Sequence, residues 1–308
     1  MTIYNSPPKT YILILNYCSF DDTVECANSV RASTYPNYNI LVIDNDSPDG
    51  SGQQLNSTIP HEEFLQLPFN TGYAGGNNEG IKIALSHGAK YVFIINPDVR
   101  LTENSITSYI EFMELNPDVS ALNPIQVRGD NTNLDEFFAK EVFDGNAIQR
   151  PDFPIQPGLS WEVKSLFGAA LLLRRSTLES IGGFDPLYFA YWEEMDLCRR
   201  IRYHAGKLVV ISDHPVQHLR NYQDSNINKF RSFLRLKGMY LYQLKSPALA
   251  FRIATKRTFK SLISDIFNGK REFGNGLFNY IKILLWLIWN LPAIKRHRQM
   301  DRNGRSYI

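Results

Sequence analysis

Three acidic side chains close together form the most distinctive chemical group of this chain. The run LYFAYWEEMDLCRRIR holds Glu193, Glu194 and Asp196, and the aromatic residues Tyr191 and Trp192 precede them. Acids in the first turn of a helix are ordinarily capping residues that the helix dipole favours. Three acids exceed what capping requires, and neighbouring carboxylates raise one another's pKa, which suits a general base. The cluster therefore predicts proton abstraction from a hydroxyl, and the aromatic rings predict a floor for a sugar acceptor.

A further acid, Asp98, ends an apolar strand in the run YVFIINPDV. One or two carboxylates, with phosphate oxygens and water, are the usual ligands of Mg²⁺ or Mn²⁺. A turn or N-cap aspartate is the plainer interpretation of Asp98 taken alone. His218 is a candidate metal ligand or phosphate contact, and His214 is a weaker one. Together with the acid cluster, Asp98 predicts transfer of a group from a metal-bound diphosphate donor.

Two polar loops follow other apolar strands and are candidate contacts for a nucleotide. DNDSPDGS holds Asp44 and Asp46, and a carboxylate there can accept the N3–H of uracil or thymine; an ordinary Asx turn is the alternative. NTGYAGGNNEG places glycines before a helix, which lets the backbone approach a phosphate closely. It matches neither GxGxxG nor the Walker A pattern, so the sequence disfavours dinucleotide binding and P-loop chemistry.

The order of elements predicts an α/β fold with a mostly parallel sheet. Four apolar runs have the length of buried strands: 11–16, 40–44, 63–67 and 91–96. Helical patterns alternate with them at 22–33, 79–87 and 103–115. This alternation favours a parallel sheet with helices on both faces, whose ligands bind beyond the carboxyl ends of the strands. Residues 125–160 have no regular pattern, which predicts an insertion or a loop that forms a lid. A strand pattern returns within 161–174.

Charge is divided unequally along the 308 residues. Residues 1–224 hold 16 Lys/Arg and 28 Asp/Glu, and residues 225–308 hold 17 and 3, which sum to the 33 and 31 of the whole chain. The balance is therefore −12 in the first part and +14 in the second. We predict a catalytic domain over 1–225 and a basic helical region over 226–308. Within the catalytic domain, the candidate nucleotide contacts fall at about 9–125 and the candidate acceptor part at about 160–220.

The basic region predicts contact with an anionic surface. Its most apolar run, 280–294, is interrupted by Lys282 and Pro292 and is short for a membrane span of about 20 residues. Amphipathic helices rich in Lys, Arg and Trp lie at the interface of anionic membranes, so we expect peripheral association. The alternatives are packing on the catalytic domain or a homodimer contact. A nucleic-acid-binding role is the rival from another class, but the aliphatic and Trp content fits lipid better, so we expect no nucleic-acid partner.

The motifs, taken in order, resemble family 2 glycosyltransferases of the GT-A fold, especially the rhamnosyltransferase-like branch. They are ILNY, DNDSPDGS, NTGYAGGNNEGI, INPDV, FGAALLLRR and GGFDPLYFAYWEEMDLCRRIR, followed by His218. The likeness covers about residues 9–220, and the ordered set is specific although each piece is common. It implies an inverting hexosyltransferase that uses a nucleotide-diphosphate sugar. NTGYAGGNNEGI and FDPLYFAYWEEMDLC point to dTDP-L-rhamnose, with UDP-galactose or UDP-N-acetylglucosamine as the alternative donors.

The resemblance also implies roles for individual residues. The donor set comprises Asn16, Asp44, Asp46, Gly72, Gly75, Asn77 and Asn96. Asp98 matches the last acid of the family's DxD metal motif, whose first acid is Asn96 here, so His218 or water completes the Mg²⁺ or Mn²⁺ shell. The family's Glu-Asp pair appears as Glu193-Glu194, which puts Glu194 at the base position.

The expected setting is bacterial surface polysaccharide synthesis, such as O-antigen, with a saccharide acceptor that is lipid-linked. Cys18, Cys26 and Cys198 have no CxxC spacing, and the polar N-terminus MTIYNSPPKTY is no signal peptide, so the expected place is the cytoplasmic face of the cell membrane. A non-catalytic, sugar-binding relative of these enzymes remains an alternative. The presence of Asp98 and Glu194 argues against it.

Overall fold

A computed structural model describes residues 6–219, 229–269, 276–304 and 307–308. The predicted boundary at 225/226 lies outside the described residues. The strands are β1 Thr10–Asn16, β2 Tyr38–Asp44, β3 Phe64–Gln66, β4 Tyr91–Ile95, β5 Val99–Arg100, β6 Val119–Arg128, β7 Ser160–Glu162, β8 Ala170–Arg174 and β9 Lys207–His218. The helices are α1 Phe20–Arg31, α2 Ser51–Thr58, α3 Gly72–Ser86, α4 Ser105–Leu115, α5 Glu136–Val142, α6 Arg175–Ile181, α7 Glu193–Tyr203, α8 Lys229–Leu244, α9 Phe251–Phe267 and α10 Leu277–Asn303, with short 3-10 turns at His61–Glu63, Asp144–Asn146 and Pro186–Tyr188.

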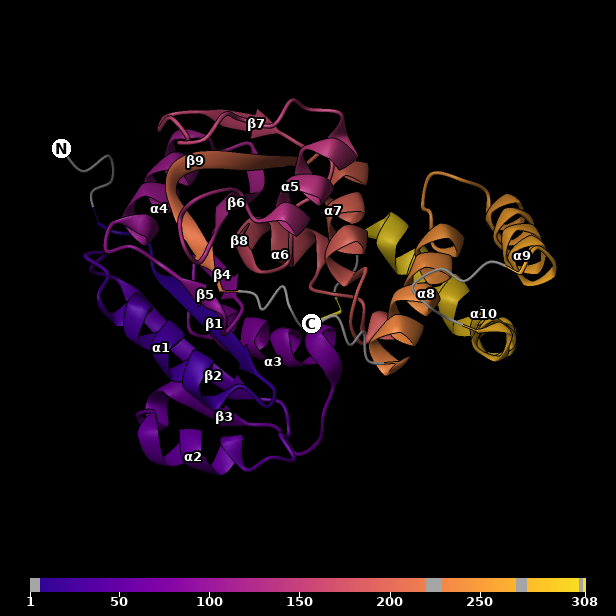
Figure 1. Ribbon diagram of the computed structural model, residues 1–308, viewed down its shortest axis with the longest axis horizontal. Helices are drawn as coiled ribbons and strands as arrows, with labels where there is room; N and C mark the ends of the chain where they lie inside the picture. The colour runs from indigo at the N-terminus through magenta and orange to yellow at the C-terminus, as the bar shows by residue number, and fades with distance from the viewer. Residues whose placement is uncertain (1–5, 220–228, 270–275, 305–306) are drawn as a thin grey trace.

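The described strands form one mixed sheet (Figure 1). Its order is β3-β2-β1-β4-β8-β6-β9-β5, and β7 pairs with β9. β1, β2, β3 and β4 form the predicted parallel block, whereas β8 pairs antiparallel with both β4 and β6. The carboxyl ends of β1, β2 and β4 therefore meet at one edge, where the predicted donor loops begin.

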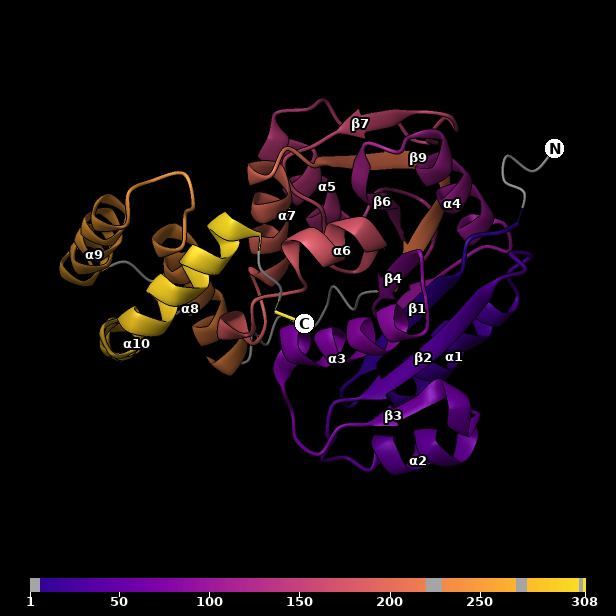
Figure 2. The ribbon, with the colours of Figure 1, turned by 180° about the vertical axis from the view of Figure 1, so that it is seen from behind.

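The parallel strands are apolar throughout because the sheet is covered on both faces. Alternate residues point to opposite faces, so Leu13 and Ile94 join one core while Ile14 and Ile95 join the other. Helices α3, α6 and α7 bury their apolar residues in the first core, and α1 and α4 bury theirs in the second. Figure 2 shows α3 and α6 on the face that belongs to the first core.

Helix α3 begins seven residues before the predicted start at 79, so the glycine-rich run is helical rather than a loop. Gly76 and Gly80 lie where the helix passes closest to the sheet. A Cβ at Gly80 would stand 2.6 Å from Cδ1 of Ile43, and one at Gly76 would stand 2.5 Å from Cδ1 of Leu15. These glycines therefore let α3 pack directly on β1 and β2, which explains their spacing without a phosphate.

The predicted irregular segment 125–160 is more ordered than expected. It contains the end of β6 and the helix α5, whose Phe138, Ala139 and Val142 are buried in the main core. The segment therefore forms part of the catalytic domain's packing and is not an unpacked insertion.

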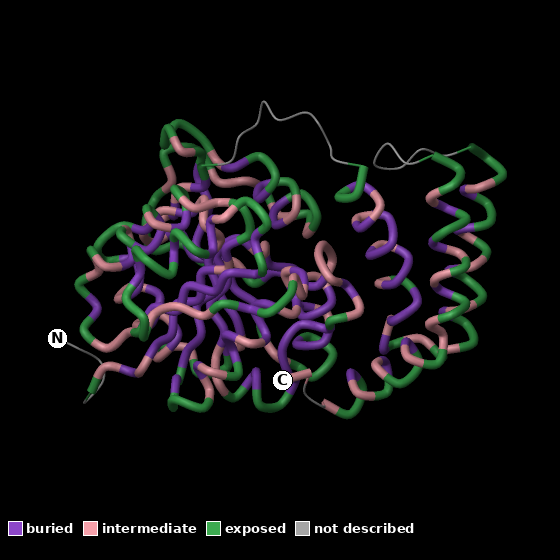
Figure 3. The backbone as a smooth tube through the Cα atoms, turned by 90° about the horizontal axis from the view of Figure 1, so that it is seen from below, coloured by how far each residue is buried: buried purple, intermediate pink, exposed green. Residues whose placement is uncertain are grey.

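The basic region forms a helical unit beside the catalytic domain (Figures 1 and 3). Tyr240 of α8, Leu262 of α9 and Tyr280 of α10 share a separate core with Tyr188 of the catalytic domain. Helix α10 is long and apolar enough to cross a membrane by length and composition, and only 22% of its apolar window is buried. The helical prediction is confirmed, with Pro292 lying inside α10.

Candidate functional site

The acid pair stands at the start of α7, after a segment with an unusual backbone. Phe189, Tyr191 and Trp192 have positive φ angles of 63°, 67° and 75°. Such conformations are costly for large side chains, and they concentrate at functional sites where surrounding packing enforces them. Here they turn the chain sharply and set Glu193 and Glu194 in the first turn of the helix, as predicted.

The two glutamates differ in their protonation. Burial, together with the adjacent charge of Glu194, raises the pKa of Glu193 well above its usual value. Burial, with repulsion from Glu141, raises the pKa of Glu194 to about 7. Buried neighbouring carboxyls share a proton in this way because two close negative charges in a poorly solvated place are unfavourable. Glu193 is thus the protonated member of the pair, and Glu194 is the one that ionises near neutral pH.

Asp98 and His218 are brought together by strand pairing. β5 follows Asp98 directly and pairs antiparallel with the end of β9, so that Val99 stands opposite His218. The backbone N–H of Leu219 donates to the carbonyl of Asp98 at 2.8 Å. As a result, Nε2 of His218 lies 3.3 Å from Oδ2 of Asp98. The histidine is buried, and the Asp98 side chain is 32% exposed.

This pair fits a divalent cation. Adjacent ligands of an octahedral ion, each at about 2.1 Å, stand about 3 Å apart, close to the separation found here. An imidazole nitrogen and a carboxylate oxygen are both suitable donors for Mn²⁺. The residues present therefore fit the group, and Asp98 and His218 are the side chains that would hold it.

Tyr73 of α3 connects the acid pair with the metal pair. Its hydroxyl donates to the carbonyl of Gly168 at 2.7 Å, and a Cβ at Gly168 would lie 3.8 Å from Cβ of Glu194. Burial raises the pKa of Tyr73, and the charges of Glu193, Glu194 and Asp98 raise it further. The charges of both groups thus act on one tyrosine. The neighbouring backbone agrees, because the ring of Phe167 packs against His218 at a centroid distance of 6.2 Å and the next residue, Gly168, lies beside Glu194.

The donor loop after β2 is built on Asp44. This buried carboxylate accepts hydrogen bonds from the side chains of Asn16 (2.6 Å), Ser47 (2.6 Å) and Gln66 (2.8 Å) and from the backbone of Ser47 (3.0 Å). A carboxylate accepts about four hydrogen bonds, and Asp44 already accepts four. The base of a nucleotide could therefore bind Asp44 only by displacing one of these donors. Asp46 is exposed, as is Asp49 of the same loop, and Asp46 has a φ of 58°.

The other predicted donor residues lie on neighbouring elements. Gly72 and Gly75 lie in the first turn of α3, whereas the sequence predicted that they precede the helix; their contact with the donor stays a prediction. Asn77 is buried in α3, and its Nδ2 donates to the carbonyl of Tyr73 at 3.0 Å. Asn96 is held next to the start of β8, because its N–H donates to the carbonyl of Ala169, the residue before that strand, at 2.9 Å.

Asp196 does not join the glutamate pair, which corrects its prediction as a catalytic acid. It lies two residues beyond Glu194 in α7, and its partners are basic side chains. Its carboxylate contacts Arg199 at 2.7 Å and Arg200 at 2.9 Å. Although burial opposes the charge, Lys245 and the two arginines hold the pKa of Asp196 well below its usual range. Its low pKa and its ion pairs make Asp196 a weak base and hold it in a salt-bridge network.

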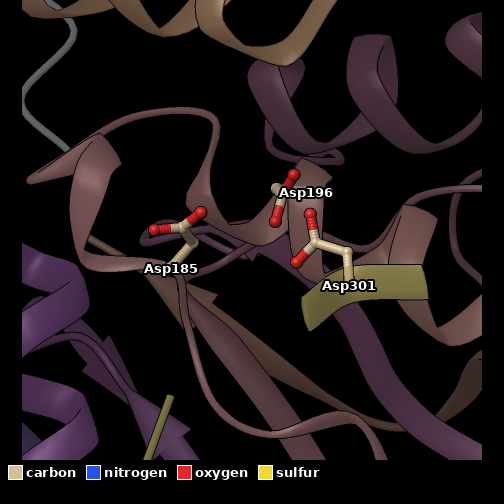
Figure 4. A group of neighbouring side chains, drawn as sticks. All are labelled: Asp185, Asp196 and Asp301. Atoms are coloured by element: carbon tan, nitrogen blue, oxygen red, sulfur yellow. The ribbon is translucent and has the colours of Figure 1, made fainter. Parts of the chain in front are cut away.

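Asp185, Asp196 and Asp301 converge on one buried point (Figure 4). Three clustered carboxylates resemble a metal site, but the ammonium of Lys245 lies among them. Its Nζ contacts Asp185, stands 3.3 Å from Asp196 and stands 3.2 Å from Asp301. The lysine therefore fills the place of a cation, and this cluster joins α7 to α8 and α10 instead of binding metal.

The two predicted acceptor aromatics have different surroundings. The Trp192 ring packs against Tyr242 of α8 at a centroid distance of 5.3 Å, and its indole closes on Gly238. The structure therefore does not support Trp192 as an open sugar floor. Tyr191 is partly exposed, with the Arg235 guanidinium 4.7 Å from its ring centre.

Several site residues carry no signal that single-sequence reasoning detected. Asn45 lies between the two predicted acids of DND, and its amide holds both Thr71 and Gly72 at the start of α3. Asn78 bonds both backbone groups of Phe184 and so fixes the segment that leads to α7. The doubled Asn of NTGYAGGNN could have suggested the second role.

Comparisons with known proteins identify the family and the fold of this chain. The family described as Glycosyl transferase family 2 matches residues 11–182. The low-salt glycan biosynthesis hexosyltransferase Agl10 of Haloferax volcanii is 24% identical over 197 residues, which cover 62% of this chain and 61% of that protein. The N-acetylglucosaminyl-diphospho-decaprenol L-rhamnosyltransferase of Mycobacterium tuberculosis is 27% identical over 199 residues, covering 56% and 64%. The chain thus spans slightly less than two thirds of the length of these two relatives.

A third relative, rhamnosyltransferase WbbL of Escherichia coli, is 23% identical over 280 residues, covering 84% of this chain and 99% of that one. Among solved structures, mannosyltransferase PcManGT from Pyrobaculum calidifontis, in complex with GDP-Man and Mn²⁺, has a TM-score of 0.56 at 14% identity, covering 96% of this chain and 85% of that one. S. aureus TarS 1-349 with UDP-GlcNAc also reaches 0.56, at 15% identity, covering 97% and 93%. These structures establish the fold, and the family match covers more than half of the chain. The chain belongs to glycosyl transferase family 2, and it is similar to the rhamnosyltransferases of that family.

Proposed function

We propose that this protein is an inverting glycosyltransferase that moves L-rhamnose from dTDP-L-rhamnose to a hydroxyl of a lipid-linked saccharide. The observation that carries the proposal is the position of residues 167–168, where Phe167 packs against His218 of the metal pair and Gly168 lies beside Glu194 of the acid pair. A displacement at an anomeric carbon needs stabilisation of the leaving diphosphate and a base for the incoming hydroxyl. The two pairs supply residues of the right kind for each task.

Glu194 is the general base in this proposal, and Glu193 stays protonated beside it. The acceptor hydroxyl gives its proton to Glu194 as its oxygen bonds to the anomeric carbon, and the bond to the diphosphate oxygen breaks with its electron pair. Because the pKa of Glu194 is about 7, it is largely ionised at slightly alkaline pH and still basic enough to accept the proton. Glu193 holds its own proton and so limits charge repulsion within the pair.

Asp98 and His218 serve the leaving group. Mg²⁺ or Mn²⁺ bound there would neutralise the charge that develops on the nucleoside diphosphate. Asp98 is the partly exposed member and faces the donor, whereas the buried His218 closes the inner side.

The rhamnose donor is supported by the relatives. Two similar proteins are named as rhamnosyltransferases, and one of them as acting with a decaprenol-diphosphate-linked sugar. A lipid-linked acceptor in surface polysaccharide synthesis follows from that name by analogy. UDP-sugars are the second candidate donors.

Helix α10 supports a membrane-bound acceptor. Its buried residues Tyr280, Ile283, Leu287 and Ile294 repeat at helical spacing and pack on α8 and α9. A second apolar stripe, which we call the outer stripe, lies on the exposed side and consists of Phe278, Ile281, Leu285, Ile288 and Trp289. Trp289 is 86% exposed. A helix that is apolar on both sides, in a region of charge +14, fits the interface of an anionic bilayer at the cytoplasmic face.

Donor choice is tested by a thermal-shift screen. The purified chain is heated with dTDP-L-rhamnose, UDP-galactose, UDP-N-acetylglucosamine or GDP-mannose, each with and without Mn²⁺ or Mg²⁺. We expect the largest metal-dependent rise in Tm with dTDP-L-rhamnose. A larger rise in Tm with a UDP-sugar would show that this sugar, and not dTDP-L-rhamnose, is the donor. No rise in Tm with any nucleotide sugar would count against the transferase proposal.

Membrane association is tested by flotation with liposomes that contain anionic lipid. Replacing Leu285 and Trp289 by Ser removes part of the outer stripe, and replacing Phe69 and Leu115 by Ser removes exposed apolar residues of the catalytic domain as a matched control. We expect only the first pair to reduce flotation. Equal flotation of both variants and the parent would remove the outer stripe as the contact.

A further inference from the structure

A third side chain, that of Asp135, lies next to the Asp98–His218 pair. It comes from the segment 125–160, which the sequence predicted to be irregular. Asp135 is fully buried, and its Oδ2 lies 3.2 Å from Nδ1 of His218. The imidazole therefore stands between two carboxylates, with Asp98 beside one ring nitrogen and Asp135 beside the other.

The two oxygens of Asp135 have separate tasks. Oδ1 accepts the backbone N–H of Phe138 at 2.8 Å and caps the start of α5. The backbone N–H of Asp135 donates to the carbonyl of Gln126 in β6 at 2.9 Å, which anchors the residue to the sheet. With Oδ1 used by the helix, Oδ2 is directed to the imidazole. The position of this oxygen is thus fixed by a helix cap and a strand.

We propose that Asp135 is a positioning residue for the metal site: it receives the Nδ1–H of His218, so that Nε2 presents its lone pair beside Asp98. A neutral imidazole has one N–H and one lone pair, and the partner of one nitrogen decides the role of the other. Metal-bound histidines commonly give their second N–H to a carboxylate, which fixes the ring and strengthens it as a ligand. This inference rests on the metal role of Asp98 and His218 proposed above.

The test measures metal binding, not turnover. Mn²⁺ is titrated into the full-length chain, alone and with thymidine diphosphate, and free Mn²⁺ is followed by EPR. Pulsed EPR of the bound ion then reports whether a nitrogen nucleus is directly coordinated. Asp135→Asn is the chosen variant because Asn caps a helix about as well as Asp, so α5 keeps its start while the charge on His218 is lost.

We expect Asp135→Asn to bind Mn²⁺ about 10- to 100-fold more weakly and to lose or weaken the nitrogen signal. Asp130→Asn changes an exposed acid a few residues earlier in the same segment and should leave both readouts as in the parent. Asp135→Ser provides a second capping residue that cannot reach the imidazole, and it should behave like Asp135→Asn. Circular dichroism and Tm of each variant confirm that the fold is retained.

Parent-like affinity and nitrogen signal in folded Asp135→Asn or Asp135→Ser would overturn the inference while leaving the metal site in place. A parent protein whose bound Mn²⁺ shows no nitrogen signal, or a His218→Ala variant with parent affinity, would overturn both the inference and the metal role of His218. Neither result would change the assignment of the donor or of Glu194. The thermal-shift screen tests the donor, and the Glu194→Gln variant tests the base.

Discussion

Nε2 of His218 and Oδ2 of Asp98 lie 3.3 Å apart, although the two residues are 120 positions apart in the chain. The contact depends on β5, a strand of two residues that pairs with the last residues of β9. The pairing of Val99 with His218, and the hydrogen bond from Leu219 N–H to the carbonyl of Asp98, hold the backbone so that the two side chains meet. A site built on strand ends in this way is more rigid than one built on loops.

Asp98→Ala should weaken metal-dependent donor binding at least about tenfold, because it removes the exposed ligand of the pair. The measurement is calorimetry of dTDP-L-rhamnose binding with Mn²⁺ and with EDTA. Asp22→Ala, which removes an exposed acid of α1, serves as the control. Unchanged binding in Asp98→Ala would rule out its metal role.

Glu194→Gln should reduce kcat by about 10²–10⁴-fold, the usual range for loss of a general base. Donor affinity should change little, since the amide has nearly the same size and Glu194 is proposed to act on the acceptor. Steady-state kinetics and donor calorimetry separate the two effects. Glu62→Gln, at an exposed position in the 3-10 turn before β3, should have parent activity. Parent turnover in Glu194→Gln would show that another group takes the proton.

The rate should rise with pH through about 7 and level off above it. The base must be ionised to accept a proton, and the pKa of Glu194 is about 7. kcat measured from pH 5.5 to 8.5 should therefore follow a single ionisation on the acidic side. The residual rate of Glu194→Gln should lack this ionisation, and a parent profile that is flat across this range would contradict the role of Glu194.

The same raised pKa has a consequence for stability. A carboxyl whose pKa is higher in the folded than in the unfolded state favours folding while it is protonated, and this contribution is lost as pH rises from about 4.5 past about 7. Glu194→Gln removes the cost of burying the charge. Its Tm relative to the parent should therefore be higher at pH 8 than at pH 5, by about 2–4 °C for each kcal/mol gained. An equal difference at both pH values would argue against a buried, ionising Glu194.

Lys245→Met should destabilise the protein strongly, by about 3–5 kcal/mol, because it leaves three buried carboxylates without their shared cation. Denaturant unfolding measures the loss, and Lys260→Met, at an exposed position of α9, is the control. If a bound metal held this cluster instead, EDTA would destabilise the parent and Lys245→Met would be mild.

Local patterns in the chain determined much of this protein. The lengths of the apolar runs predicted the four strands of the parallel block, and the motif order predicted the family. The same patterns predicted Asp98, His218 and the Glu193–Glu194 pair as site residues, since strand ends and helix starts are recognisable from neighbours in sequence. The predicted start of α3 was wrong. Glycine has a low helix propensity, so its residues were not predicted to be helical, but tight packing on β1 outweighs that preference here.

Tertiary structure alone decided which acids act together. Asp196 has the same sequence context as Glu193 and Glu194, yet its side of α7 faces Lys245 and Arg200, so it became part of a salt-bridge network. Asp135 carried no signal, yet the pairing of β6 with β9 and the cap of α5 put it beside His218. Sequence periodicity reports which side of an element is apolar. The partner that covers each polar side is set by strand register and helix packing between residues far apart in the chain.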